Sequence, residues 1–205
     1  MTKLLIFDFD GVIMDSLGFY FDAWSRAMKA LGREDLAERE AFLSLLDGNL
    51  YEAMTRQGLP FGVFPEIGNR IHSALGLSRI APFPGIPEII RNLSLTTSLA
   101  LVSSNTSTFI KGCLERYEMA RFFHPILGAD ADRMKGQKIE TALYVNNAPA
   151  AESFYICDTV GDILEARSVG IRVAAVTWGW HTPERLRRAH PDHLLHRPEE
   201  LMGLC

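Results

Sequence analysis

A short apolar run near the N-terminus predicts a buried strand that cannot form a sheet with its neighbours in sequence. The run is Leu4-Leu5-Ile6-Phe7, and the acids Asp8 and Asp10 follow it. From Asp15 to about Leu77, apolar residues recur at spacings of three and four, which predicts helices and no convincing strand. Because a single strand is not stable alone, it must pair with strands encoded later. The helical segment is therefore predicted to be an insertion into one α/β domain.

After residues 82–85, Pro-Phe-Pro-Gly, the pattern changes to alternating strands and helices, which is typical of a parallel sheet. Short apolar runs predict strands at residues 99–102, 125–127, 154–156 and 172–176, with an edge strand at 193–195. Helices are expected to begin near Pro87, Thr106, Gln137 and Val160. The predicted domains are an α/β core of residues 1–14 and 82–205 and an all-helical insertion of residues 15–81.

Composition narrows the class of protein. The chain has 205 residues, of which 47% are hydrophobic and 22% charged, and these values are typical of a globular protein. A net charge of -4 and a pI near 5.9 disfavour nucleic acid as a partner, and the basic stretch 185–188 is expected to be a solvated helix face. No signal-like segment and no run of about 18 apolar residues occurs, which argues against a membrane partner. Three widely spaced cysteines predict neither a disulfide framework nor a zinc site. A cytoplasmic monomer or homodimer is expected.

Polar residues follow three of the predicted strands at their carboxyl ends. Asp8 and Asp10 follow the first, Ser104 and Asn105 follow residues 99–102, and Asp158 follows residues 154–157. A lysine follows the strand near residue 126, either Lys135 or Lys138. Carboxyl ends of parallel strands share one edge, where α/β sheets bind ligands, so these groups should converge. The alternative is that Asp8 and Asp10 merely close the strand before Gly11 as turn acids.

The chemistry of such a site is that of a phosphate and a divalent cation. Several carboxylates in one pocket cannot all ionise near pH 7 without a cation, and Mg²⁺ prefers carboxylate and carbonyl oxygens. Asp8 could attack phosphorus to form an aspartyl-phosphate, while Asp10 protonates the leaving oxygen and later deprotonates water. Ser104 and backbone N–H groups near Gly11 and Asn105 would hold the phosphate oxygens. The lysine would offset the charge of the phosphoryl group.

These motifs, taken in order, resemble those of the haloacid dehalogenase superfamily, in its phosphoglycolate phosphatase-like and β-phosphoglucomutase-like branch. The first is residues 8–16, Asp-Phe-Asp-Gly-Val-Ile-Met-Asp-Ser; the second is Ser104-Asn105; the third is residues 134–139, Met-Lys-Gly-Gln-Lys-Ile; and the fourth is residues 157–162, Cys-Asp-Thr-Val-Gly-Asp. The resemblance covers nearly the whole chain. It implies a Rossmann-like three-layer α/β/α core with a parallel sheet, and it identifies residues 15–81 as a helical cap.

The resemblance also assigns roles residue by residue. It implies that Asp8 is the nucleophile, that Asp10 is the acid/base and a metal ligand through its carbonyl, and that Asp158 is the remaining metal ligand. Asp162 would support the site from nearby. In the third motif Lys135 is the preferred active-site lysine, Lys138 is the alternative, and both could instead be surface lysines. Cys157 stands where the family usually has glycine, and a small buried thiol is the simplest interpretation of it.

The predicted function is Mg²⁺-dependent hydrolysis of a small phosphorylated metabolite, with a phosphoglycolate-type substrate as the leading candidate. A phosphosugar mutase is the alternative within catalysis, but Asn49 and Tyr20 stand where those mutases carry Arg and His. A regulatory or binding protein that has lost turnover is the alternative outside catalysis. The loop 46–49, Leu-Asp-Gly-Asn, is a candidate substrate-facing turn, and His181 is expected to be exposed.

Overall fold

A six-stranded, fully parallel sheet forms the centre of the molecule. The computed structural model describes residues 3–59 and 80–204. The strand order is β5-β4-β1-β6-β7-β8, and every neighbouring pair is parallel. The strands are β1 (Leu4–Phe7), β4 (Ser98–Val102), β5 (Phe123–Leu127), β6 (Phe154–Cys157), β7 (Arg172–Val176) and β8 (His193–Leu195). The predicted partnership of the first strand with strands encoded after the helical segment is therefore confirmed.

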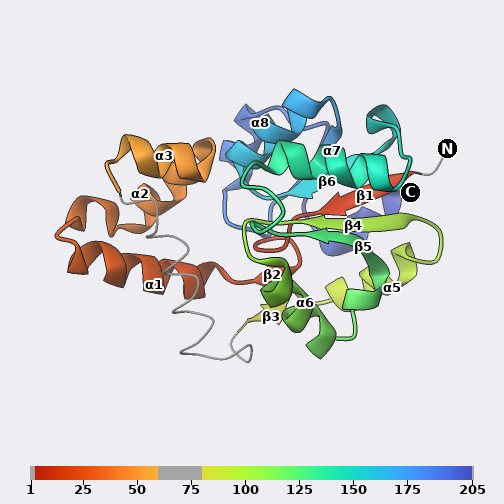
Figure 1. Cartoon of the computed structure of the whole chain (residues 1–205), viewed down its shortest axis with the longest axis horizontal. Helices are drawn as coiled ribbons and strands as arrows, with labels where there is room; N and C mark the ends of the chain where they lie inside the picture. The colour runs from red at the N-terminus through yellow and green to blue at the C-terminus, as the bar shows by residue number, and fades with distance from the viewer. Residues whose placement is uncertain (1–2, 60–79, 205) are drawn as a thin grey trace.

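Alternation of side chains along the strands divides the core into two layers. In β1, Leu5 and Phe7 pack on one face of the sheet, and Leu4 and Ile6 pack on the other. The first face is covered by α5 (Ile86–Leu93), α6 (Ser107–Arg116) and η6 (Pro198–Leu204), where η denotes a 3₁₀ helix. The second face is covered by α7 (Lys135–Val145), α8 (Val160–Val169) and α9 (Pro183–Arg188). Figure 1 shows α7 and α8 above the sheet and α5 and α6 below it. The predicted three-layer α/β/α core is confirmed.

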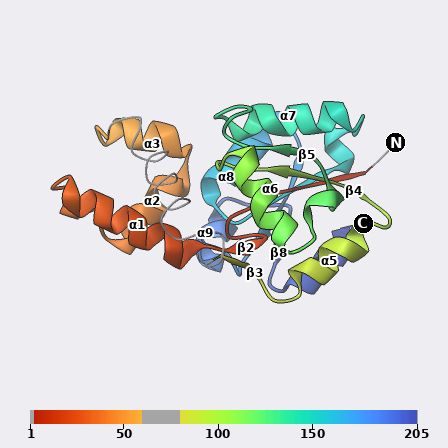
Figure 2. The same cartoon turned by 60° about the horizontal axis from the view of Figure 1, so that its bottom comes forward.

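The described part of the expected insertion forms a helical lobe, residues 17–59, beside the carboxyl ends of the strands (Figures 1 and 2). Its elements are α1 (Leu17–Ala30), η1 (Glu34–Leu36), α2 (Arg39–Ser44), η2 (Leu45–Asp47) and α3 (Leu50–Arg56). The lobe has its own hydrophobic cluster, which includes Trp24, Met28 and Phe42. Residues 60–79 lie outside the described residues, so the boundaries of the predicted insertion stay a prediction.

Short elements complete the fold. A two-stranded antiparallel ladder joins β2 (Met14–Asp15) to β3 (Ala81–Pro82) where the chain leaves and re-enters the core. Sequence analysis does not detect this ladder, because strands of two residues are too short to show an alternating pattern. Two further 3₁₀ helices within the described residues are η4 (Ala120–Phe122) and η5 (Ala150–Glu152). Within the described ranges, no helix is long and apolar enough to cross a membrane.

The expectation that His181 is exposed is wrong. His181 is buried, with 2% of its surface exposed. Its Nδ1 accepts the N–H of Val160 at 3.1 Å, and its Nε2 donates to the carbonyl of Leu43 at 3.0 Å. Burial lowers the pKa of His181. The basic stretch is exposed at Arg187 and Arg188 as expected, whereas Arg185 is half-buried and its Nε donates to Asp47 Oδ1 at 2.7 Å. His181 and Arg185 both contact the helical lobe, and sequence reasoning could not see that contact.

Candidate active site

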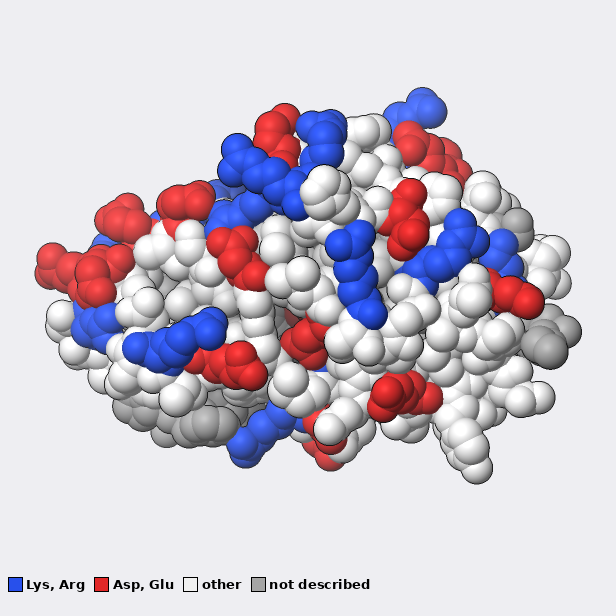
Figure 3. Space-filling view, turned by 90° about the horizontal axis from the view of Figure 1, so that it is seen from above, with Lys and Arg blue, Asp and Glu red and all other residues white. Residues whose placement is uncertain are grey.

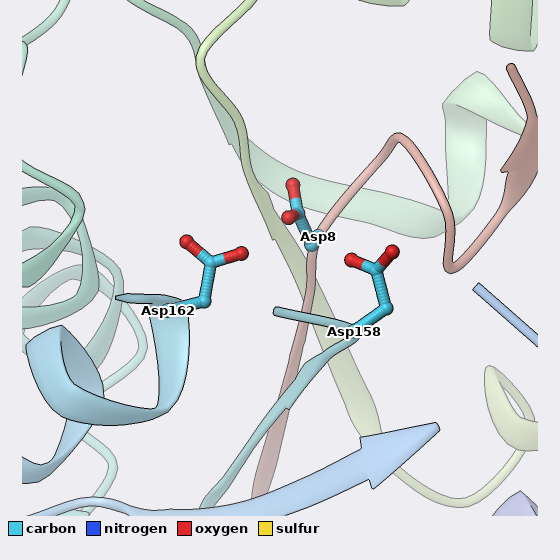
Figure 4. Close-up of side chains that lie close together, drawn as sticks. All are labelled: Asp8, Asp158 and Asp162. Carbon is cyan, nitrogen blue, oxygen red and sulfur yellow. The ribbon is translucent and has the colours of Figure 1, made fainter. Parts of the chain in front are cut away.

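Three buried acids meet at the carboxyl edge of the sheet. Asp8 directly follows β1, Asp158 directly follows β6, and Asp162 lies in the first turn of α8. Their exposed fractions are 5%, 1% and 7%. One carboxylate oxygen from each lies within 4.8 Å of those of the other two. Figure 4 shows the three side chains turned toward a common space.

Lys135 lies between two of these acids. Its Nζ is 2.6 Å from Asp8 Oδ2 and 2.8 Å from Asp162 Oδ1. Burial disfavours ionisation of both Lys135 and Asp162. The ion pair outweighs burial, raising the pKa of Lys135 well above its usual value and lowering that of Asp162. The lysine is therefore a fixed positive charge at the centre of the acid cluster.

The alternative lysine, Lys138, lies one helical turn further along α7. Its Nζ donates to the carbonyl of Ser103 at 2.5 Å, and the residue is 1% exposed. Burial, followed by repulsion from Lys135, lowers the pKa of Lys138 to about 8. The structure therefore puts Lys135 rather than Lys138 against Asp8, and neither lysine is a surface residue.

The cluster contains more acid than its lysine can neutralise. Burial raises the pKa of Asp8 to about 8, with Lys135 opposing the shift and repulsion from Asp162 adding to it. Burial and the charges of Asp8 and Asp162 also raise the pKa of Asp158 well above its usual range. Asp158 is held in place by the backbone N–H of Trp180, which donates to Oδ2 at 2.7 Å. Such an excess of buried carboxylates fits a divalent cation.

Asp10 is held by a relay that begins in the helical lobe. Tyr20 Oη donates to Asn105 Oδ1 at 2.8 Å, and Asn105 Nδ2 donates to Asp10 Oδ2 at 2.5 Å. Asp10 Oδ1 is buried and has no hydrogen-bond partner in the described part of the chain. Burial raises the pKa of Asp10 to about 6, against the hydrogen bond from Asn105 and the charge of Lys135.

Two backbone donors predicted to hold phosphate are already bonded. The N–H of Gly11 donates to the carbonyl of Met14 at 2.9 Å, and the N–H of Asn105 donates to Ser103 Oγ at 3.1 Å. Both bonds close tight turns after their strands, a detail that strand-end reasoning does not resolve. Gly11 has a φ of +73°, and a Cβ there would lie 1.9 Å from Asp158 Oδ2. Glycine is therefore required at this position so that Asp158 can approach the turn.

These groups line a cavity of about 60 Å³ between the core and the helical lobe. Ser104 lies in its wall, and the loop expected to face substrate contributes Leu46, Gly48 and Asn49. Two further wall residues, Arg133 and Glu165, were not identified from the sequence. Glu165 lies three residues after Asp162 on α8, and this helical spacing was the signal that could have found it.

The face drawn in Figure 3 has basic and acidic side chains interspersed over both the lobe and the core. It shows no continuous basic surface among the described side chains, in agreement with the acidic net charge. The expectation against a nucleic-acid partner remains a prediction.

Comparison with known proteins connects this geometry to a family. The model of the family described as "Haloacid dehalogenase-like hydrolase" matches residues 5–176. A phosphoglycolate phosphatase of Synechococcus elongatus is 27% identical over 203 residues, covering 98% of this chain and 95% of the relative. A probable phosphatase, IndB, of Dickeya dadantii is 28% identical over 216 residues, covering 99% and 93%.

Solved structures show the same fold. A structure titled as a haloacid dehalogenase-like hydrolase from Streptococcus pneumoniae superimposes with a TM-score of 0.82 at 23% identity, covering 98% of this chain and 97% of that one. A structure of a "putative phosphoglycolate phosphatase" from Lactobacillus plantarum gives a TM-score of 0.82 at 20% identity, and the match covers all of both chains. At these identities the likeness establishes the architecture alone.

Proposed function

Because the chain belongs to the haloacid dehalogenase-like hydrolases, we propose that it is a Mg²⁺-dependent phosphomonoester hydrolase acting on a small phosphorylated metabolite. The observation that carries the proposal is the placement of Lys135 between Asp8 and Asp162, with Asp158 beside them and Asp10 lining the same cavity. This arrangement offers a nucleophile, a proton carrier and a fixed cation in one cavity.

In the proposed reaction Asp8 attacks the phosphorus atom of the ester. A P–O bond to the Asp8 carboxylate forms while the P–O bond to the leaving group breaks, and Asp10 gives its proton to the leaving oxygen. A water molecule then gives its proton to Asp10 and attacks the phosphorus of the aspartyl-phosphate. Inorganic phosphate leaves, and Asp8 and protonated Asp10 are restored. Lys135 fixes the orientation of the Asp8 carboxylate during both steps.

The residues present fit a magnesium ion. Asp8 and Asp158 are carboxylates without enough compensating charge, and they would hold the ion together with the backbone carbonyl of Asp10. Asp162 is bound to Lys135 and would support the site rather than ligate. When bound, Mg²⁺ offsets negative charge on the phosphoryl oxygens and lowers the pKa values of its carboxylate ligands.

The substrate is proposed to be small and of the phosphoglycolate type. Two observations support this choice: the names of the similar phosphatases and a cavity of about 60 Å³ closed by the helical lobe. We propose that this lobe, within residues 15–81, serves as a cap that excludes water. The mutase alternative is less well supported, because Asn49 and Tyr20 carry no positive charge and are hydrogen-bonded to Glu165 and Asn105.

The test is release of inorganic phosphate from a panel of small phosphomonoesters, with Mg²⁺ and with a chelator. We expect Mg²⁺-dependent release by the wild type and loss of about 10³-fold or more of kcat in Asp8→Asn, which removes the nucleophile. Asp22→Asn, an exposed acid on α1 outside the cavity, is the matched control and should turn over normally. Absence of release from every ester would reject the hydrolase, and conversion of one sugar phosphate to an isomer would favour the mutase.

A further inference from the structure

Glu165 uses its two carboxylate oxygens to join two parts of the molecule. Oε1 accepts a hydrogen bond from Asn49 Nδ2 of the helical lobe at 2.7 Å. Oε2 accepts the backbone N–H of Lys135 at 2.7 Å and that of Gly136 at 3.3 Å. One side chain on α8 therefore contacts both the lobe and the first turn of the helix that carries the active-site lysine.

The first turn of α7 depends on this contact. A helix begins with unsatisfied N–H groups, which are usually capped by the residue that precedes it. Here that residue is Met134, whose side chain makes no capping bond. The N–H of Met134 is taken by Asp132, and those of the next two residues are taken by Glu165. The carboxylate is also favoured at a helix N-terminus by the helix dipole. Glu165 therefore fixes the backbone from which Lys135 reaches Asp8.

Both the oxygen and the nitrogen of the Asn49 side-chain amide are hydrogen-bonded. Its Oδ1 accepts the N–H groups of Tyr51 and Glu52, at 3.1 Å and 3.2 Å, and so caps α3. Its Nδ2 is then turned toward Glu165, because no second orientation satisfies both sets of partners. The adjoining loop lies against the core, since a Cβ on Gly161 would come within 2.2 Å of the Gly48 carbonyl oxygen. The Asn49–Glu165 bond therefore forms only when the lobe is docked on α8.

We propose that Glu165 is a positioning residue through which docking of the helical lobe fixes Lys135 against Asp8. The connection runs from α3 through Asn49 and Glu165 to the start of α7. The proposal rests on the proposed function only for the role of Lys135 in turnover. Charge-assisted hydrogen bonds depend on geometry and polarise one another. Loss of the Asn49 donor therefore weakens the hydrogen bond that Glu165 accepts from the backbone N–H of Lys135. By linkage, an ordered Lys135 also favours the docked lobe.

Substitutions at Asn49 separate this role from helix capping. Serine and aspartate both cap helices well, so Asn49→Ser and Asn49→Asp keep α3 intact while removing the amide donor. Asn49→Asp also sets a second carboxylate against Glu165, so it should be the more damaging of the two. Asn92→Asp adds the same charge on the exposed surface of α5 and is the matched control.

Exchanging the donor and the acceptor between positions 49 and 165 should restore their hydrogen bond and with it the activity. In the double variant Asn49→Asp/Glu165→Gln, the new amide can donate to the new carboxylate while its oxygen still accepts the N–H of Lys135. We expect kcat to fall about 10-fold or more in Asn49→Asp, less in Asn49→Ser, and to return to within about threefold of wild type in the double variant. A merely destabilised lobe would not be rescued by a second substitution.

Hydrogen exchange of the Lys135 and Gly136 amides tests the same connection without turnover. We expect their protection to fall in Asn49→Asp, to fall less in Asn49→Ser and to recover in the double variant, while Asn92→Asp behaves as wild type. Unchanged protection and unchanged kcat in Asn49→Asp would overturn the proposal. So would a double variant whose kcat and protection are no higher than those of the more impaired of the two single variants, Asn49→Asp and Glu165→Gln. If the wild type hydrolyses no ester, the exchange experiment still decides the proposal, so the two failures are distinguishable.

Discussion

At the scale of single residues, Tyr20 is the part of the relay to Asp10 that the helical lobe supplies. Its hydroxyl donates to Asn105, whose amide in turn donates to Asp10. The residue is 3% exposed, so the hydroxyl has no access to an alternative partner in water. The orientation of Asp10 therefore depends on a residue outside the core.

Tyr20→Phe should reduce turnover more than it reduces stability. Loss of the donor leaves Asn105 Oδ1 unsatisfied and frees its amide to turn away from Asp10, so kcat is expected to fall about 10-fold, with a stability loss of about 1 kcal/mol. The matched control is Tyr117→Phe, which removes a hydroxyl donating to the Ile80 carbonyl at 3.2 Å, at a residue that does not line the active-site cavity. The control should cost similar stability and leave kcat unchanged. Equal effects of the two variants on kcat would contradict the relay.

Lys138 predicts a dependence of stability on pH. Its pKa is about 8 in the folded state, below the usual 10.5. Between these values the unfolded chain binds the proton and the folded protein does not, so wild-type stability rises with pH and the gain is lost as pH falls through about 8. Relative to Lys138→Met, which cannot titrate, the wild type should gain about 2 kcal/mol between pH 7.5 and 9.5. Urea unfolding at the two values measures this, and a constant difference would disprove the lowered pKa.

At the scale of elements, the first turn of α8 is shaped to receive the helical lobe. Gly161, the second residue of α8, faces the carbonyls of Leu46 and Gly48, and a Cβ would lie 2.9 Å and 2.2 Å from their oxygens. Gly18 occupies the second position of α1, and a Cβ there would meet no atom of the described residues within 4 Å. The two glycines differ in surroundings rather than in helical position.

Alanine at these two sites should therefore have opposite effects. Gly18→Ala is expected to stabilise the protein by about 0.5 kcal/mol, because alanine loses less backbone entropy in a helix. Gly161→Ala is expected to destabilise it by about 1–3 kcal/mol, because backbone atoms of the lobe must move. The difference in urea unfolding free energy between the variants is the measurement. If Gly161→Ala were also stabilising, the lobe would not be docked on α8 as described.

The start of α7 shows why element boundaries were only partly predictable. The sequence predicts a helix beginning near Gln137, whereas α7 begins at Lys135. No capping residue precedes Lys135 in sequence, because the cap is Glu165, thirty positions later on α8. A cap supplied by another element leaves no local pattern, so propensity alone places the start of the helix too late.

At the scale of the whole molecule, folding assembles an acid cluster from distant parts of the chain. Asp8 comes from β1, whereas Asp158 and Asp162 come from the β6–α8 connection. Burying like charges together opposes folding. A cation that binds only the folded protein should therefore stabilise the whole molecule.

Magnesium should raise the melting temperature. At a hundredfold excess over Kd, binding contributes about 2.7 kcal/mol, which corresponds to a rise of about 5–10 °C for a protein of this size. In Asp158→Asn the rise should be largely lost. This variant should also melt above the wild type in a chelator, because one of the repelling charges is gone. Identical melting of the wild type with Mg²⁺ and with a chelator would contradict a metal site at these acids.

Local sequence patterns are sufficient to predict the α/β class, the positions of all six strands of the sheet and the placement of Asp8 and Asp158 at its carboxyl edge. These features follow from apolar periodicity and from acids that directly end a strand, and such signals are local in the chain. The order of the motifs was sufficient to identify the family.

Which side chains contact one another in the site depends on tertiary packing. In the folded protein, Lys135 rather than Lys138 contacts Asp8, and Asn105 donates a hydrogen bond to Asp10. His181 is buried against the helical lobe, and Asn49 of the lobe donates to Glu165. The Lys135, His181 and Asn49 contacts depend on how a helix is rotated against the sheet or how the lobe docks on α8, whereas the Asn105 contact depends on the pairing of β1 with β4. Residues three positions apart, such as Lys135 and Lys138, share one helix face, so sequence spacing cannot choose between them, whereas a difference in packing of a few ångströms does.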